Sequence, residues 1–341
     1  MTKPSPVSVA LLVAVAGLSL FPLSDDEFYI ELVTHLMVMA IFAMSLDLLI
    51  GYTGLVSFGH AAFFGLAGYL LAIVTPQEEA VSIFFSLPIS LLGTAIAALV
   101  IGWFSVRTSG IYFIMITLAF AQMMFYYFNE NLDLGGSDGI FIFSKPIVGF
   151  GDFQILDLAN PNTVYYFVLA SLVGCYLLLT MILRAPFGQV IQAIRANEHR
   201  ARALGYNTSR FKLVVFVIAG TMAGYAGYLE AISTGIVSPG HLNWHQSGLV
   251  LMVVILGGMG TLYGPAFAAF ALGLLQDQVQ EFTEHWLLVQ GMFIILVVLF
   301  LPHGIAGLVT RLAARESNDS LTEEDRTNGD GAAAITGKRT S

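Results

Sequence analysis

Charged side chains are scarce in this sequence. Asp, Glu, Lys and Arg together make up 11% of its 341 residues, whereas they make up about a quarter of a soluble domain. Hydrophobic residues account for 57% of the chain, and the mean hydropathy is +0.79. Apolar runs of about 20 residues recur from end to end, long enough for a helix to cross a hydrocarbon core, and they lack the alternation of barrel strands. The composition excludes a soluble globular protein and predicts an all-α polytopic membrane protein.

The sequence also has few of the residues on which enzyme chemistry depends. Its single cysteine, Cys175, lies in an apolar run and cannot form an internal disulfide. No His, Cys and carboxylate residues stand at metal-ligand spacing, and no convergent catalytic set is visible, so we expect neither a metal site nor enzymatic activity. No G-x-x-x-x-G-K-[ST] motif is present to cradle a nucleotide phosphate. The chain is therefore expected to bind no cofactor itself, and any ATP and Mg²⁺ must be held by partner subunits.

Hydropathy predicts about ten transmembrane spans, two of them short. The predicted spans cover residues 7–23, 29–50, 60–75, 82–106, 110–128, 163–183, 212–234, 247–260, 264–280 and 286–303. The eighth and ninth are separated by "GGMGTLYGP", in which several glycines and Pro265 interrupt the apolar run. An interruption of this kind is typical of the broken helices found in transporters.

The distribution of basic residues predicts the orientation, because Lys and Arg near span ends favour the cytoplasm. With ten crossings and a cytoplasmic N-terminus, nearly all basic residues of the ordered segments lie on the cytoplasmic side: Lys3, Arg107, the six in residues 184–212, Arg311 and Arg315. Only Lys145, in the long loop over residues 129–162, lies outside. Merging the eighth and ninth spans would place Arg311 and Arg315 outside, so the charge bias favours ten spans and a cytoplasmic C-terminus.

The segment over residues 184–212 holds six basic residues and a single acid, Glu198. Apolar residues recur at helical spacing from 189 to 204, which predicts an amphipathic helix. Arg195 and Arg202 lie seven positions apart, so we expect them to share one face of this helix. Two interpretations fit such a helix. It either lies on anionic lipid headgroups or docks against a cytosolic protein.

Two glycine-rich motifs interrupt apolar stretches, "GYTGLVSFGH" at residues 51–60 and "GGMGTLYGP" at residues 257–265. Broken backbone at membrane depth is tolerable where it lines a cavity or is covered by protein. The predicted substrate-pathway residues are therefore Gly51, Gly54, Ser57, His60, Gly257, Gly260, Thr261 and Tyr263. The alternative is that the glycines only allow close helix packing. Asp47, just before the first motif, is expected to hydrogen-bond to the broken backbone nearby.

Five motifs, taken in order and spacing, resemble the permease subunits of ABC importers for branched-chain amino acids, specifically the LivM type. They are "GYTGLVSFGHAAFFGLAGY", "SGIYFIMITLAFAQM", "GGSDGI", "RAPFGQVIQAIRANEHRARALGYN" and "ILGGMGTLYGPAFAAF". The resemblance covers about residues 30–305. It implies an importer with a second, LivH-like permease subunit, two cytosolic ATP-binding subunits and an extracytoplasmic substrate-binding protein, located in a bacterial-type inner membrane. Membrane lipid is then a further partner, and nucleic acid is not.

The same resemblance implies roles for the basic segment. The loop over residues 185–212 resembles a coupling helix seated in a groove of the ATPase, so Arg195, Glu198, Arg202 and Gly205 become the expected coupling residues. Such importers often carry a Glu followed by a Gly six residues later, whereas Glu198 and Gly205 are seven apart. We divide the chain into a transmembrane permease domain over residues 1–312, with its coupling loop at 184–212, and a disordered cytosolic tail over residues 313–341.

Other functions stay open at the level of sequence. Importers of urea and short amides use a similar permease, and the apolar pathway does not distinguish their substrates from leucine. An ion-coupled secondary transporter would also use broken helices, but it would need a buried carboxylate, for which only Asp47 and Glu230 are candidates. A channel would be expected to show a ring of charges or carbonyls, and no such signature is present.

Overall fold

A computed structural model describes residues 6–24, 26–76, 81–150, 153–156, 158–283, 285–300, 304, 306 and 307. The predicted tail over residues 313–341 lies outside the described residues, as do Lys3, Arg311 and Arg315. The helices are α1 (Pro6–Leu20), α2 (Glu27–Thr53), α3 (His60–Val74), α4 (Ile83–Ser105), α5 (Ile111–Glu130), α6 (Pro161–Arg184), α7 (Pro186–Ala196), α8 (Glu198–Ala203), α9 (Thr208–Thr234), α10 (Trp244–Gly257), α11 (Tyr263–Phe282) and α12 (Trp286–Phe300). Short 3₁₀ helices and strands are η1 (Phe21–Ser24), η2 (Leu132–Leu134), η3 (Gly136–Asp138), η4 (Pro239–Leu242), β1 (Ile140–Phe141), β2 (Val148–Phe150), β3 (Phe153–Leu156) and β4 (Ile236–Val237).

Every predicted span coincides with one helix of the structure. Five of the described helices, α2, α4, α5, α6 and α9, are long and apolar enough to cross a bilayer. Helices α3 and α10 and parts of α1 and α12 are apolar but shorter than the 18 residues of that criterion. The chain is thus a mostly helical protein with several candidate membrane spans, as predicted, and the number ten stays a prediction.

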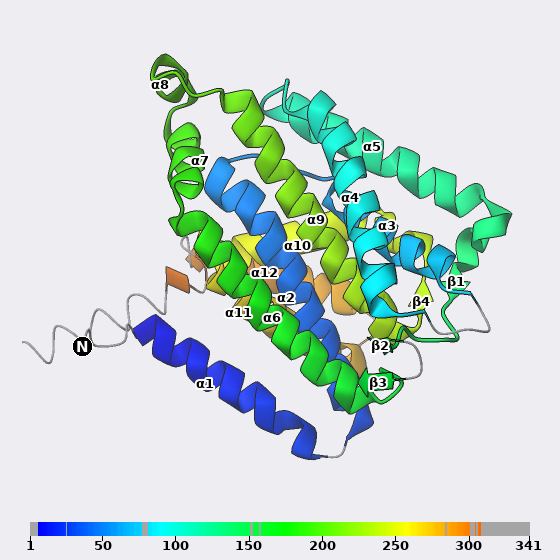
Figure 1. Cartoon of the computed structure of the whole chain (residues 1–341). Helices are drawn as coiled ribbons and strands as arrows, with labels where there is room; N and C mark the ends of the chain where they lie inside the picture. Colours follow the sequence, from blue (N-terminus) through cyan, green and yellow to red (C-terminus); the bar gives the residue numbers. More distant parts are fainter. Residues whose placement is uncertain are drawn as a thin grey trace, which may run out of the picture.

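Helix α2 forms the centre of the bundle and crosses behind α6 and α9 in Figure 1. Its most apolar 18-residue window is 89% buried, against 28% in α4 and α6 and 22% in α5. The outer helices expose large apolar side chains such as Leu92, Trp103 and Met115, as expected of surfaces that face lipid. The position of α2 places the first glycine motif, at its end, in the interior of the protein.

Helix α3 begins inside the bundle rather than at its edge. The Nε2 atom of His60, its first residue, lies 3.0 Å from Oγ of Ser45, which is about two turns before the end of α2. Residues 54–59 therefore run back alongside α2 without helical structure. The N–H group of Ala61 donates to Oγ of Ser247 in α10, at 2.9 Å, so a neighbouring helix satisfies part of the broken backbone.

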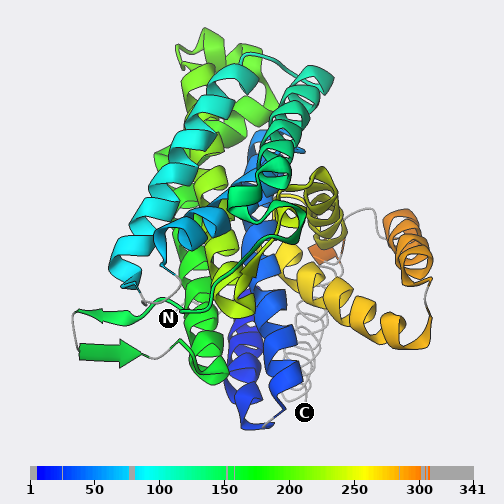
Figure 2. The same cartoon turned by 90° about the vertical axis from the view of Figure 1, so that its right-hand side faces the viewer.

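The long loop over residues 129–162 is attached to the bundle at two places, after α9 and at the start of α4. Strand β1 pairs antiparallel with β4, the segment that follows α9, with Ile140 opposite Val237. A side chain at Gly139 would overlap the Val237 carbonyl and lie 2.8 Å from Cα of Ser238, which explains the glycine at the end of "GGSDG". Strands β2 and β3 pair with each other beside the start of α4, where the N–H of Ile83 donates to the Ile147 carbonyl at 2.9 Å and Oγ of Ser82 donates to the Gly149 carbonyl at 2.8 Å. This hairpin projects sideways from the bundle in Figure 2.

The basic segment over residues 184–212 departs from the prediction. A single amphipathic helix over residues 189–204 is wrong: the structure has α7 and α8, separated at Asn197, whose backbone is extended. The Asn197 side chain accepts a hydrogen bond from the N–H of Arg200 at 2.9 Å, which caps α8 as a new helix. Arg195 and Arg202 therefore belong to different helices and do not share a face, because the helical phase is interrupted between them.

Candidate functional site

The two glycine motifs meet in the structure, at the junction of the α2 end with the turn between α10 and α11. A Cβ added at Gly51 would overlap the Gly260 nitrogen and lie 2.8 Å from its Cα. Gly260 itself has φ +85°, a left-handed conformation that favours glycine. This contact brings residues more than 200 positions apart into backbone contact, and it depends on both lacking a side chain.

Asp47 closes this junction from within α2. One carboxylate oxygen, Oδ1, accepts from the N–H of Gly260 at 2.7 Å, and the other, Oδ2, accepts from the N–H of Leu262 at 3.1 Å. Both N–H groups lie in the turn before α11, outside any helix. Leu262 has φ +52°, the only positive φ of a non-glycine residue in the described part of the chain. The predicted bond between Asp47 and broken backbone is present, but the backbone belongs to the second glycine motif.

Arg195 reaches the same junction from α7. Its guanidinium, carried by α7, donates a hydrogen bond to the Gly51 carbonyl. The Arg195 Nη1 atom would also lie 3.3 Å from a Cβ at Gly260, and Arg195 Cγ would lie 3.5 Å from a Cβ at Gly54. Arg195, expected to contact a partner ATPase, therefore points into the membrane domain and connects α7 to the meeting point of the two motifs.

Glu198 fastens α8 to the beginning of α9. It accepts hydrogen bonds from Nζ of Lys212 at 2.6 Å, from Oγ1 of Thr208 at 3.0 Å and from Arg202 at 3.0 Å. Burial alone would raise the pKa of Glu198, but the hydrogen bonds and charge from Lys212, with Thr208 and Arg202, outweigh it and lower the pKa. Gly205 ends α8 with φ +91°. In this arrangement Glu198 and Gly205 shape the loop, and Arg202, with a side chain 60% exposed, remains open to solvent.

Of the other predicted pathway residues in the first motif, Gly54 is exposed, whereas Ser57 and His60 are buried. Gly54 ends α2 in a left-handed conformation, with φ +74°. His60 is fully buried, stacked on Phe42. Ser57, also buried, accepts from the N–H of Gly59 at 3.2 Å.

In the second motif, Gly257 packs directly on Gly264, where a Cβ would overlap backbone. Thr261 donates to the Gly258 carbonyl at 2.7 Å, and Tyr263 opens α11 half-buried. None of these residues lines either of the two cavities described below. Their role in a substrate pathway stays a prediction.

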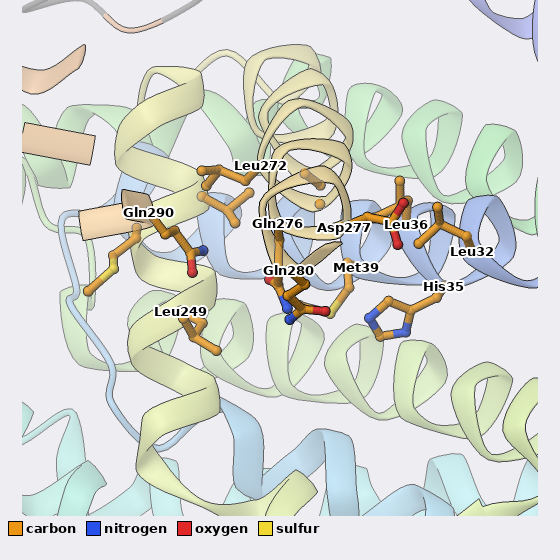
Figure 3. Close-up of a pocket in the computed structure, with 14 residues that line it drawn as sticks. Leu32, His35, Leu36, Met39, Leu249, Leu272, Gln276, Asp277, Gln280 and Gln290 are labelled. Carbon is orange, nitrogen blue, oxygen red and sulfur yellow. The ribbon is translucent and has the colours of Figure 1, made fainter. Parts of the chain in front are cut away.

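The first cavity lies between α2, α10, α11 and α12 and measures about 130 Å³. Polar side chains extend into it from three helices, as Figure 3 shows: His35 of α2, Gln276, Asp277 and Gln280 of α11, and Gln290 of α12. The sequence analysis did not single out Asp277 or the glutamines. The signal was the run "QDQVQE" at the end of a predicted span, which is unusually polar for a helix that faces lipid.

The second cavity, of about 120 Å³, adjoins the first through His35 and includes Glu31 and Lys145. Glu230 lies deep beside it, with a side chain 4% exposed, and its Oε1 lies 2.8 Å from Nδ1 of His35. Burial lowers the pKa of Lys145, and the charge of Glu31 partly opposes this change. No group of three His, Cys, Asp or Glu residues able to hold a metal ion occurs in the part of the chain that the structure describes.

Interrupted apolar helices with a polar cavity between them are features of membrane transport proteins. The model of the family described as "Branched-chain amino acid transport system / permease component" matches residues 28–298, so the chain belongs to this family. It is of the LivM type: it is 28% identical over 316 residues to the high-affinity branched-chain amino acid transport system permease protein LivM of Escherichia coli K12, covering 87% of this chain and 73% of that protein. LivM of Salmonella typhimurium LT2 is also 28% identical, over 314 residues.

More distant relatives match shorter segments. The permease protein LivH of Escherichia coli K12 is 30% identical over 134 residues, which is 38% of this chain and 43% of LivH. The xylose transport system permease protein XylH of Escherichia coli K12 is 32% identical over 146 residues, 40% of this chain and 36% of XylH. No solved structure matches the chain significantly. The relatives are permease components of transport systems, and none is named as an enzyme.

Proposed function

We propose that this chain forms part of the transmembrane pathway of an ATP-driven importer for branched-chain amino acids. A second, LivH-like permease subunit completes the pathway, two cytosolic subunits bind and hydrolyse ATP with Mg²⁺, and an extracytoplasmic binding protein delivers the substrate. The chain itself binds no cofactor. It crosses a bacterial-type cytoplasmic membrane ten times, with both termini in the cytoplasm, and α7 and α8 form the coupling segment.

The family match over residues 28–298 carries this proposal. The contact between Arg195 and the Gly51 carbonyl supports the coupling role, because a displacement of α7 would act directly on the junction of the two glycine motifs. Asp47 has a structural role, since both of its carboxylate oxygens accept backbone hydrogen bonds from the second glycine motif. Glu230 pairs with His35 through Oε1, and its Oε2 has no hydrogen-bond partner among the described residues.

The test is uptake of labelled leucine, with labelled urea for comparison, into proteoliposomes. The vesicles hold this chain with its neighbouring permease and ATP-binding subunits, and binding protein and ATP are each supplied or withheld. Leucine uptake that needs both ATP and binding protein is the expected result. Urea uptake in place of leucine would identify an importer for short amides, and uptake by this chain alone under an ion gradient would refute the ATP-driven mechanism.

A further inference from the structure

The second half of α11 is polar, although the helix lies against the core of the bundle. It reads "LLQDQVQEF" from residue 274, and Gln276, Asp277 and Gln280 lie on the side that lines the first cavity. Gln290 reaches the same space from α12 and is buried. Figure 3 shows the amides of Gln276 and Gln280 close to one another and near the His35 ring.

The polar groups of these side chains are not paired with other groups in the described part of the protein. Among the described residues, the side chains of Gln276, Asp277, Gln280 and Gln290 have no hydrogen-bond or ion-pair partner. His35 engages only its Nδ1, with Glu230. The N–H donors and the carbonyl and carboxylate acceptors of Asp277 and the three glutamines are therefore free to bind water or a ligand in the cavity. A cavity of about 130 Å³ has room for several waters, or for a small ligand in their place.

The remaining walls of the cavity are aliphatic. Leu36 and Met39 of α2 line one side, Leu249 and Met252 of α10 another, and Leu272 of α11 a third. The cavity therefore offers one carboxylate, several amide N–H donors and an apolar wall. This set matches a small zwitterion with an apolar side chain, because a carboxylate pairs with an ammonium and amide N–H groups donate to a carboxylate.

We propose that this cavity is a binding site for the transported amino acid during its passage through the membrane. Asp277 binds the α-ammonium group, the amides of Gln276, Gln280 and Gln290 donate to the α-carboxylate, and Leu249 with its aliphatic neighbours contacts the substrate side chain. Urea lacks both the ammonium and the apolar part, so this site favours an amino acid over a short amide. The inference rests on the proposed function and adds a site to it.

The first experiment measures the ratio of leucine transported to ATP hydrolysed in proteoliposomes holding the complete importer. Asp277→Asn keeps the size of the side chain and removes its charge. The expected result is normal assembly and normal stimulation of ATP hydrolysis by the binding protein, with a ratio lowered about tenfold or more, because a charged hydrogen bond to the substrate is lost. Glu281→Gln is the matched control, since Glu281 is exposed on the same helix and does not line the cavity.

An unchanged ratio in Asp277→Asn would overturn the proposal, as would loss of assembly in that variant, which would make Asp277 an interface or packing residue. If the wild-type complex itself shows no uptake dependent on ATP and binding protein, the proposed function fails instead. The two failures are thus distinguished by the wild-type measurement.

A second experiment identifies the occupant without relying on turnover. In the complete complex with Cys175→Ala, the variant Leu249→Cys places a thiol on the cavity wall, and its rate of maleimide labelling is followed. Leucine should slow labelling several-fold, whereas 4-methylpentanoate, which lacks the ammonium, should not, and Asp277→Asn should abolish the protection. Equal protection by both compounds, or none by leucine, would refute the assignment of Asp277.

Discussion

Gly51 is the residue on which the contact between the two glycine motifs depends. Its backbone lies against that of Gly260, and a methyl group there would overlap both Asp47 Oδ1 and the Gly260 nitrogen. Gly260 is needed for a different reason, its positive φ. The surroundings of Gly51 therefore fit close helix packing, which was the alternative to a role in the substrate pathway.

Gly51→Ala is expected to destabilise the protein. The methyl group would force α2 away from the turn at Gly260 and would disturb the two hydrogen bonds of Asp47, at a cost of about 1–3 kcal/mol. A thermal melt of the purified complex in detergent measures the change. Gly174→Ala is the control, because nothing lies within 4 Å of a Cβ at Gly174 in α6, and alanine there should be neutral or stabilising. Equal melting temperatures for Gly51→Ala and the parent would contradict the packing argument.

Asp277 could not be recognised as a cavity residue from the sequence. Asp47 and Glu230 stood out as isolated charges in apolar runs, and both prove to be buried and hydrogen-bonded. Asp277 lies in a polar run at the end of a predicted span, where a charge is unremarkable, and only the packing of α11 against α2 shows that its side of the helix faces a cavity. Which glycines meet was likewise not predictable, because the pairing of Gly51 with Gly260 is a tertiary contact.

At the scale of elements, α7 and α8 have different attachments. Helix α7 is tied to the membrane domain through Arg195 and the Gly51 carbonyl, whereas α8 is tied to α9 through Glu198. Helical periodicity continued through Asn197 and hid the boundary. The pair Asn197 and Glu198 was nevertheless a readable signal, since an Asn cap followed by an acid is typical of a helix start.

Arg195→Ala is expected to uncouple α7 from the glycine junction. The complex should still assemble with its ATP-binding subunits, but leucine uptake should fall about tenfold, the effect of removing a charged hydrogen bond of roughly 1.5–3 kcal/mol. Uptake and copurification are measured together. Arg200→Ala is the control, because Arg200 is exposed on α8. Wild-type uptake in Arg195→Ala would show that the bond to Gly51 has no part in coupling.

The attachment of α8 should depend on pH. The folded-state pKa of Glu198 is lowered, so its contribution to stability is present above the ordinary glutamate value of 4.5 and is lost as the pH falls from that value through the folded pKa. The protection of α8 amides from hydrogen exchange, corrected for the intrinsic exchange rate at each pH, should therefore fall below about pH 4.5 in the parent protein. In Glu198→Gln this protection should already be low at neutral pH and should change little on acidification. An acid-sensitive α8 in the variant would assign the effect to another group.

At the scale of the whole molecule, the helix positions followed from the length of apolar runs, and the membrane topology rests on the positions of basic residues. For the short helices α3 and α10, apolar length alone does not explain how the helix is accommodated in a membrane. Helix α3 begins inside the bundle, where Oγ of Ser247 accepts from the N–H of Ala61, and α10 ends inside it, where Gly257 packs on Gly264, so neither needs the full thickness of a bilayer.

Topology can be tested with single cysteines in a Cys175→Ala background and a membrane-impermeant maleimide. In intact spheroplasts, Asp133→Cys and Thr283→Cys should be labelled from outside, and Arg200→Cys only after permeabilisation. Ten crossings require Thr283 to lie outside, because α10 and α11 each count as one. Labelling of Thr283→Cys only after permeabilisation would show that α10 and α11 together make a single crossing.

The hydrogen bonds of Asp47 also bear on the order in which the chain is made. Its partners, Gly260 and Leu262, lie 213 and 215 residues further along the sequence. At about 5–20 residues per second, the ribosome needs roughly 10–40 seconds to synthesise that stretch. Throughout this time the nascent α2 holds a carboxylate whose final hydrogen-bond donors do not yet exist, and a lone Asp in hydrocarbon costs about 2.5–3.5 kcal/mol. Helix α2, at the centre of the bundle, is thus among the first helices to be synthesised, yet the hydrogen bonds of its Asp47 form only after the turn before α11 has been made.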